Sequence, residues 1–227
     1  FHYETNVIIF DGLKKLYVEG ETAIYYIMVG NDNYVMPDMP EGCEEGIVKG
    51  LYKFRVKDVP KSKHRVQLFG SGAIMPSVLK AQEILADKYK IASDVWSVTS
   101  YTQLRRDAQE CARWNMLHPT EKPRTSYLED TLADVEGPFI ASSDYVKALA
   151  EQVAPYLPGN LLALGTDGMG RSETREALRR HFEVDAESVV IASLYQLSLD
   201  GKIDAKEVAA AIKALDYDPE KKFPLYA

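Results

Sequence analysis

Regular alternation of strand-like and helix-like segments is the feature that most limits the folds open to this chain. After about residue 64, short apolar and β-branched runs alternate with longer amphipathic ones, for example RVQLFGSG, MPSVLKAQEILADKYK, SDVWSVTS and YTQLRRDAQECARWNML. Strands separated by helices of this length need crossover connections, and these favour parallel pairing. The pattern predicts a three-layer α/β/α domain over residues 64–227 with a mostly parallel sheet.

The alternation continues to the end of the chain. Two further strands are predicted at GPFIASS and NLLALGT. Four further helices are predicted at DYVKALAEQVAPYL, TREALRRHF, DAESVVIASLYQLSLDG and DAKEVAAAIKALD.

The first part of the chain has a different pattern. ETNVIIFDGLKKLYVEG predicts a helix, TAIYYIMVG a buried strand, and EEGIVKGLYKFRVKDVPKSKH a short helix followed by a Lys-rich linker. One helix and one strand supply too little core to fold alone. We therefore expect residues 1–55 to be the end of a preceding domain and residues 56–63 to be a linker. A chain that starts at Phe1 is also expected to be a fragment of a longer protein.

Composition narrows the classes of partner and compartment. Lys and Arg number 27 against 34 Asp and Glu, so the net charge is −7, which argues against general attraction to nucleic acid or to an anionic membrane. The two cysteines form no metal-binding or disulfide pattern, and no apolar run reaches the roughly 20 residues of a membrane span. A cytoplasmic location is the prediction.

The segment GTDGMGRSETREALRRHFEVD resembles a phosphate-binding glycine loop that runs into a helix. It lacks the Lys of a P-loop and the third glycine of a dinucleotide-binding loop, so a nucleotide is not expected. A tight turn with Ser172 or Thr174 capping the helix explains the same residues. The candidate site residues, for an interface or for an anion-binding loop, are Asp167, Gly168, Gly170, Arg171 and His181.

Two weaker signals lie on either side of this loop. QLSLDGKIDAKE places Asp200, Gly201 and Glu207 as in a calcium-binding loop, but its first and third positions are Gln196 and Ser198. A helix that ends at glycine, followed by an Asp-capped helix, explains the same residues, and we expect no calcium. His118, which precedes a proline after a helix, is the histidine best placed for direct chemistry.

Longer stretches carry a more specific resemblance. NYVMPDMPEGCEEGIVKGLYKF, SDVWSVTSYTQLRRDAQECARWNMLHP and LGTDGMGRSETREALRRHFEVDAESVVIASLYQLSLDGKID resemble the C-terminal part of the homodimeric bacterial pyruvate dehydrogenase first components. These are thiamine-diphosphate-dependent enzymes of the transketolase-like superfamily. The resemblance implies that residues 1–55 end a pyrimidine-binding domain. It also implies that residues 64–227 form a transketolase C-terminal-like domain with a mixed five-stranded sheet, whose first strand, expected at RVQLFGSG, runs antiparallel.

The resemblance also implies a reaction and partners. The parent enzyme would decarboxylate pyruvate with thiamine diphosphate and Mg²⁺ and acetylate the lipoyl group of dihydrolipoyl acetyltransferase. No residue of this chain matches the catalytic, cofactor-binding or metal motifs of the family, so the fragment alone is expected to bind no cofactor and to be inactive. Its implied roles are homodimer formation, structural support and docking of the acetyltransferase. The alternative is a stand-alone α/β domain that binds an anion or small metabolite at residues 165–172.

Overall fold

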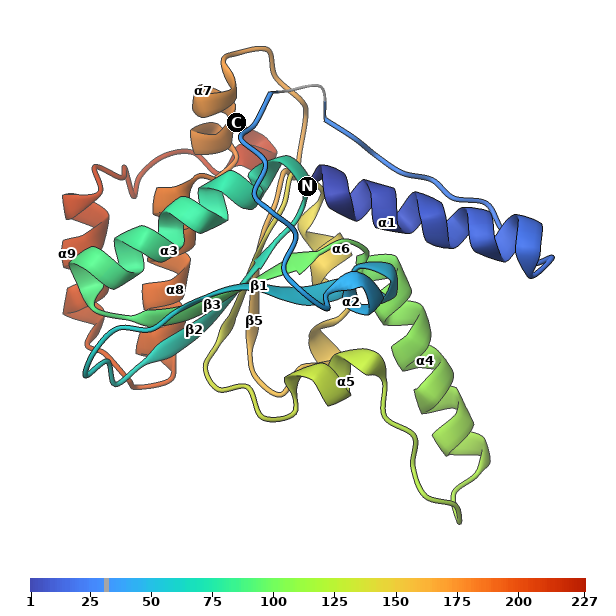
Figure 1. Cartoon of the computed structure of the whole chain (residues 1–227). Coiled ribbons are helices and arrows are strands. Elements are labelled where there is room, and N and C mark those ends of the chain that lie inside the picture. Colours follow the sequence, from blue (N-terminus) through green and yellow to red (C-terminus); the bar gives the residue numbers. More distant parts are fainter. Residues whose placement is uncertain (31–32) are drawn as a thin grey trace.

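A five-stranded sheet organises the computed structural model, which describes residues 1–30 and 33–227. The strand order is β1-β3-β2-β4-β5, and helices cover both faces of the sheet (Figure 1). The strands are β1 (Leu51–Lys57), β2 (Arg65–Gly70), β3 (Ala92–Val98), β4 (Phe139–Ser142) and β5 (Leu161–Leu164). The predicted three-layer α/β/α arrangement is confirmed.

Helices connect these strands much as the sequence predicts. Their bounds are α1 (His2–Leu13), α2 (Glu44–Lys49), α3 (Met75–Tyr89), α4 (Tyr101–Leu117), α5 (Tyr127–Leu132), α6 (Lys147–Glu151), α7 (Arg175–His181), α8 (Ala186–Leu199) and α9 (Ala205–Ala214). Helix α5 was not predicted, because it has only 6 residues. Its N-terminus is nevertheless well defined, since Ser126 and Glu129 form a reciprocal capping box.

The sheet is mixed and its first strand is antiparallel, as the resemblance implies, but that strand lies earlier in the chain than expected. β2 runs parallel to both β3 and β4, whereas β1 runs antiparallel to β3. The antiparallel strand therefore lies at Leu51–Lys57 and not at RVQLFGSG, and the Lys-rich linker begins later than predicted. β1 is an edge strand, and its charged residues Lys53, Arg55 and Lys57 pair with carboxylates of β3 and α3. Charges of this kind are common on edge strands, and they made the segment look like a linker.

Two hydrophobic cores fill the space between the layers. On one face, Val66, Leu68 and Val95 of the sheet pack against α3, α8 and α9. On the other face, Phe69, Trp96 and Phe139 pack against α4, α5 and α6. The alternation along each strand sends successive side chains to opposite cores, as a sheet buried on both faces requires.

The N-terminal segment contacts this body at the start of α1 and at two later points, where the Tyr145 hydroxyl donates to Met28 Sδ at 2.9 Å and Arg179 donates to the Tyr34 hydroxyl at 3.1 Å. Tyr3 packs with Cys43, Ile47 and Tyr52, and the Tyr52 hydroxyl donates a hydrogen bond to Glu4 at 2.7 Å. α1 continues into a π-helical turn at Lys14–Val18 and projects from the body in Figure 1.

The buried strand predicted at TAIYYIMVG is wrong. Residues 22–30 have no regular secondary structure, and no strand of the described residues pairs with them. The side chains of Ile24 and Tyr26 are 97% and 87% exposed. An apolar, β-branched run becomes a strand only where a neighbouring strand supplies hydrogen-bond partners.

Candidate functional site

The predicted glycine loop joins the end of β5 to the start of α7, and its first half packs against the segment before α6. The Thr166 amide donates to the Tyr145 carbonyl at 2.8 Å. The carboxylate of Asp167 accepts a hydrogen bond from the amide of Lys147, the first residue of α6, at 3.1 Å. Asp167 thus satisfies a backbone N–H donor at the start of α6. It does not line the pocket beside α7.

Gly168 lies against the C-terminal tail of the chain. Its φ of +99° favours glycine, and a Cβ at this position would lie 3.1 Å from the Leu225 Cα atom. Gly170 is in open space, because no described residue has an atom within 4 Å of a Cβ built there. Two of the five candidate residues, Asp167 and Gly168, therefore serve the packing of the loop.

Thr174 is the N-cap of α7, one of the two caps that the sequence predicted. Its hydroxyl accepts from the Ala177 amide at 3.3 Å. The neighbouring carboxylate of Glu173 accepts from the Thr174 amide at 2.8 Å. Ser172 is not the cap and remains exposed.

A pocket of about 500 Å³ lies beside the loop and α7. Two of the predicted site residues, Arg171 and His181, line this pocket together, although they are ten residues apart in the sequence. The other lining residues are Ser172, Glu173, Ala177 and Leu178.

His181 is the titratable group of this pocket with a shifted pKa. Desolvation by burial lowers its pKa, and the positive charges of Arg171 and Lys221 lower it further, while Glu183 acts in the opposite direction. The Nε2 atom is buried and has no hydrogen-bond partner among the described residues. The ring packs edge-on against Phe182, with centroids 4.8 Å apart.

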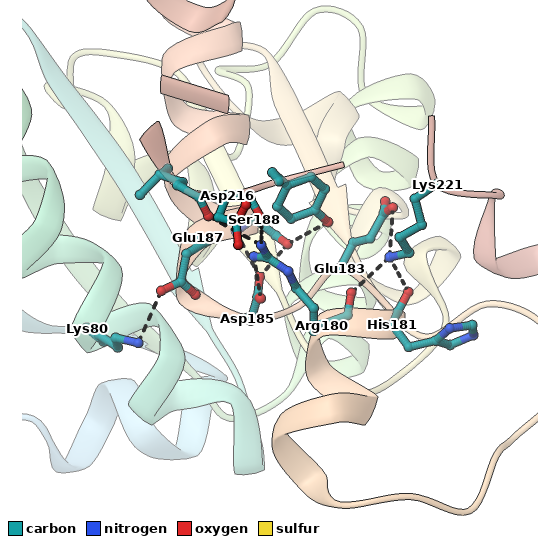
Figure 2. A network of polar contacts seen from close by, with 11 residues as sticks. Lys80, Arg180, His181, Glu183, Asp185, Glu187, Ser188, Asp216 and Lys221 are labelled. Atoms are coloured by element: carbon teal, nitrogen blue, oxygen red, sulfur yellow. Dashed lines mark hydrogen bonds and ion pairs between the residues drawn. The ribbon is translucent and has the colours of Figure 1, made fainter. Parts of the chain in front are cut away.

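A network of polar contacts holds the far end of α7, and sequence reasoning missed it. The ammonium of Lys221 donates to the carbonyls of Arg180 and His181 at 2.9 and 2.7 Å, so it caps the C-terminus of the helix. Arg180 pairs with Asp185 at 3.0 Å and lies over the Tyr217 ring. Figure 2 shows this network, with the imidazole of His181 pointing away from it. Lys221 lies about forty residues from the carbonyls that it caps, and no local pattern links them.

The other two sequence signals have structural roles. Asp204 and Glu207 form a capping box at the start of α9, and Asp204 accepts from the Lys206 amide at 2.8 Å. The calcium-like spacing is thus used for a cap. Within residues 1–30 and 33–227, no group of three or more His, Cys, Asp or Glu is placed to hold a metal ion.

His118 lies at the end of α4, away from the glycine loop. Its ring stacks on Trp114 at a centroid distance of 4.3 Å, and the Arg124 guanidinium covers the Trp114 ring at 4.1 Å. His118 Nδ1 lies 2.9 Å from the Trp114 carbonyl oxygen. These contacts stabilise the turn that follows α4 and bring no second catalytic group to the histidine.

Comparison with known proteins identifies the family. Residues 50–185, more than half of the chain, match the transketolase-like TK C-terminal domain. The chain belongs to this family. The match begins next to β1, so the edge strand lies within the family domain.

Curated relatives extend the similarity to the whole chain. The pyruvate dehydrogenase E1 component of Escherichia coli (strain K12) is 52% identical over 229 residues, which cover 100% of this chain and 25% of that protein. Those of Pseudomonas aeruginosa and Cupriavidus necator are 47% and 46% identical, each over 99% of this chain. The chain thus spans about a quarter of the length of these relatives, and it corresponds to their C-terminal part.

Solved structures agree on the fold. A transketolase of Pichia stipitis superimposes with a TM-score of 0.50 at 16% identity, over 74% of this chain and 21% of that one. The likeness is to the fold of the domain. Among the helices of the described residues, none combines the length and apolarity needed to cross a membrane.

Proposed function

We propose that this chain is the C-terminal part of a pyruvate dehydrogenase E1 component, which decarboxylates pyruvate and transfers the acetyl unit to the lipoyl group of dihydrolipoyl acetyltransferase. The observation that carries this proposal is 52% identity along the entire chain to a protein of that name. We place the enzyme in the cytoplasm.

The proposed parent enzyme uses thiamine diphosphate and Mg²⁺, and the residues described here do not fit either group. No cluster of potential metal ligands occurs in the described part of the chain. The glycine loop that most resembles a phosphate site lacks a lysine, and its Asp167 is bound to the Lys147 amide. We propose that the cofactor-binding and catalytic residues lie in the remaining three quarters of the longer protein and that this chain alone is inactive.

The N-terminal segment supports a boundary near residue 50 between two domains. Many large apolar side chains between residues 9 and 39 are exposed, including Phe10 at 72%, Tyr17 at 81% and Val35 at 98%. Soluble proteins rarely leave so much apolar surface uncovered. We propose that residues 1–49 complete a pyrimidine-binding domain and that residues 50–227 form the transketolase C-terminal-like domain. The chain would support a homodimer and provide surface for the acetyltransferase.

Two measurements test this proposal together. The first is the intact mass of the native polypeptide, which should be about four times the 25.5 kDa of this chain, as in the relatives. The second is pyruvate-dependent dye reduction with thiamine diphosphate and Mg²⁺, expected for the native protein and absent for residues 1–227 alone. A native polypeptide of 25.5 kDa would contradict the proposal and favour a stand-alone domain.

A further inference from the structure

The pocket between the glycine loop and α7 has the composition of a site for a small anion. We propose that it binds an oxyanion group, as phosphate ester or carboxylate, of a small metabolite, with Arg171 as the anchor and the imidazole of His181 close enough to respond to the bound charge. This inference does not depend on the catalytic activity of the proposed parent enzyme. It assigns an anion-binding role, and not an interface role, to the two candidate residues that line the pocket.

The first observation concerns the hydrogen bonds and ion pairs of Arg171. Within residues 1–30 and 33–227, its guanidinium forms no hydrogen bond and no ion pair. By contrast, the nearby Arg179 donates to Tyr34 and Ala73, and Arg180 pairs with Asp185. The fork of N–H donors on arginine fits the planar pair of oxygens of a carboxylate or phosphate. An unpaired arginine in a pocket is therefore suited to an oxyanion.

The second observation is the charge around His181. Arg171 and Lys221 both place positive charge near the imidazole. Among the described residues, the carboxylate of Glu183 accepts from Lys221 at 3.3 Å and that of Glu173 accepts from the Thr174 amide. Of the charges that act on the imidazole itself, Arg171 and Lys221 are positive and Glu183 is negative, so the ring lies in a positive field, which favours an anion beside it.

The third observation is the unsatisfied Nε2 atom of His181. A buried nitrogen without a partner has lost its hydration and gained no hydrogen bond in return. Because this atom is closed to solvent, an oxyanion in the pocket acts on the ring through its charge and not through a hydrogen bond to Nε2. The pocket volume of about 500 Å³ lies in the range of small-molecule sites.

Linkage provides a test that needs no enzyme activity. An anion that binds beside the imidazole favours its charged form, so saturating inorganic phosphate should raise the pKa of His181 by about one unit at constant ionic strength. The measurement is NMR titration of the four histidine rings of the chain, with His181→Gln to assign the signal. A parallel titration with acetate separates a phosphate preference from a carboxylate preference.

Two arginine variants make the test specific. Arg171→Ala should abolish the response of His181 to phosphate and acetate, and Arg171→Lys should retain part of it. Arg105→Ala removes an exposed arginine on α4 and should leave the response unchanged. All variants are compared at equal folded fraction, measured by circular dichroism. A response to either anion that depends on Arg171 supports the site. No response in the unaltered chain, or an equal response in Arg171→Ala, overturns it.

Discussion

At the scale of single residues, the glycines of the candidate loop differ in whether the surrounding structure has room for a side chain. A Cβ on Gly165 would lie 2.5 Å from the Tyr145 carbonyl oxygen, whereas one on Gly170 would meet no atom of the described residues within 4 Å. The sequence alone shows two equivalent glycines in a turn. Only the approach of the segment before α6 distinguishes them.

We therefore expect different costs for the same substitution. Gly165→Ala should lower the free energy of unfolding by about 2–4 kcal/mol, because a backbone carbonyl must move to admit the methyl group. Gly170→Ala should change it by less than about 1 kcal/mol in either direction, and it serves as the matched control. Urea denaturation of the two variants measures both. Equal costs would contradict the packing of the loop described here.

His181 predicts a pH dependence of stability. Its pKa in the folded chain is lowered from the ordinary value of 6.5, mainly by burial and then by Arg171 and Lys221. The unfolded chain therefore binds the proton more readily, so the stability that this group contributes is present above pH 6.5 and is lost as the pH falls below it.

The test compares the unaltered chain with His181→Gln. Urea midpoints measured between about pH 8 and about pH 5 should fall less steeply in the variant, because its unfolded state gains no proton at this position. Arg171→Ala should also reduce the slope, since it removes one of the two positive charges near the ring. A steeper fall in either variant would show that the sign assigned here is wrong.

At the scale of elements, most helices and strands follow local patterns, and the exceptions have identifiable causes. The structure confirms the predicted helices α3, α4, α8 and α9. These helices are long and carry clear apolar faces or caps, which a local pattern can show. β1 was missed because its outward charges form ion pairs across the sheet edge, which a linear pattern cannot show. The strand predicted at residues 22–30 fails for the opposite reason, since its composition is suitable but no partner strand lies beside it.

The start of α9 separates a capping role from a calcium-binding role. Asp204→Ala should destabilise the chain by about 1 kcal/mol, because the Lys206 amide loses its acceptor. Adding CaCl₂ should leave the thermal unfolding of the unaltered chain unchanged. The control is Asp200→Ala, which removes another acidic residue of the calcium-like pattern and should cost less. A rise in melting temperature with calcium that Asp204→Ala abolishes would restore the calcium interpretation.

At the scale of the whole molecule, the exposed apolar surface of residues 9–39 is the largest departure from an ordinary monomer. The contact region around Tyr3 and Tyr52 holds the segment to the body, but it covers little of that surface. The chain covers about a quarter of the length of its relatives. Other parts of a larger protein can therefore cover this apolar surface.

The isolated chain should therefore associate through this surface. We expect it to bind an apolar fluorescent dye and to self-associate in sedimentation velocity experiments. Phe10→Lys combined with Val35→Lys should reduce both effects and change the free energy of unfolding by less than about 0.5 kcal/mol, because both side chains are exposed. Met116→Lys, an exposed substitution on α4, is the control for added charge. Unchanged association in the double variant would place the contact surface elsewhere.

The sequence by itself determined the α/β class, the order of most elements, the choice of Ser172 or Thr174 as the cap of α7, the cap at Asp204, and the family resemblance that the comparisons confirm. These depend on local periodicity, on side chains that bond to nearby backbone, and on long stretches of similar residues. The tertiary structure decided which strand is antiparallel, which glycines are constrained, and that Arg171 and His181 share a pocket while Asp167 does not. Each of these depends on groups that are distant in sequence, and their contacts exist only after the chain has folded.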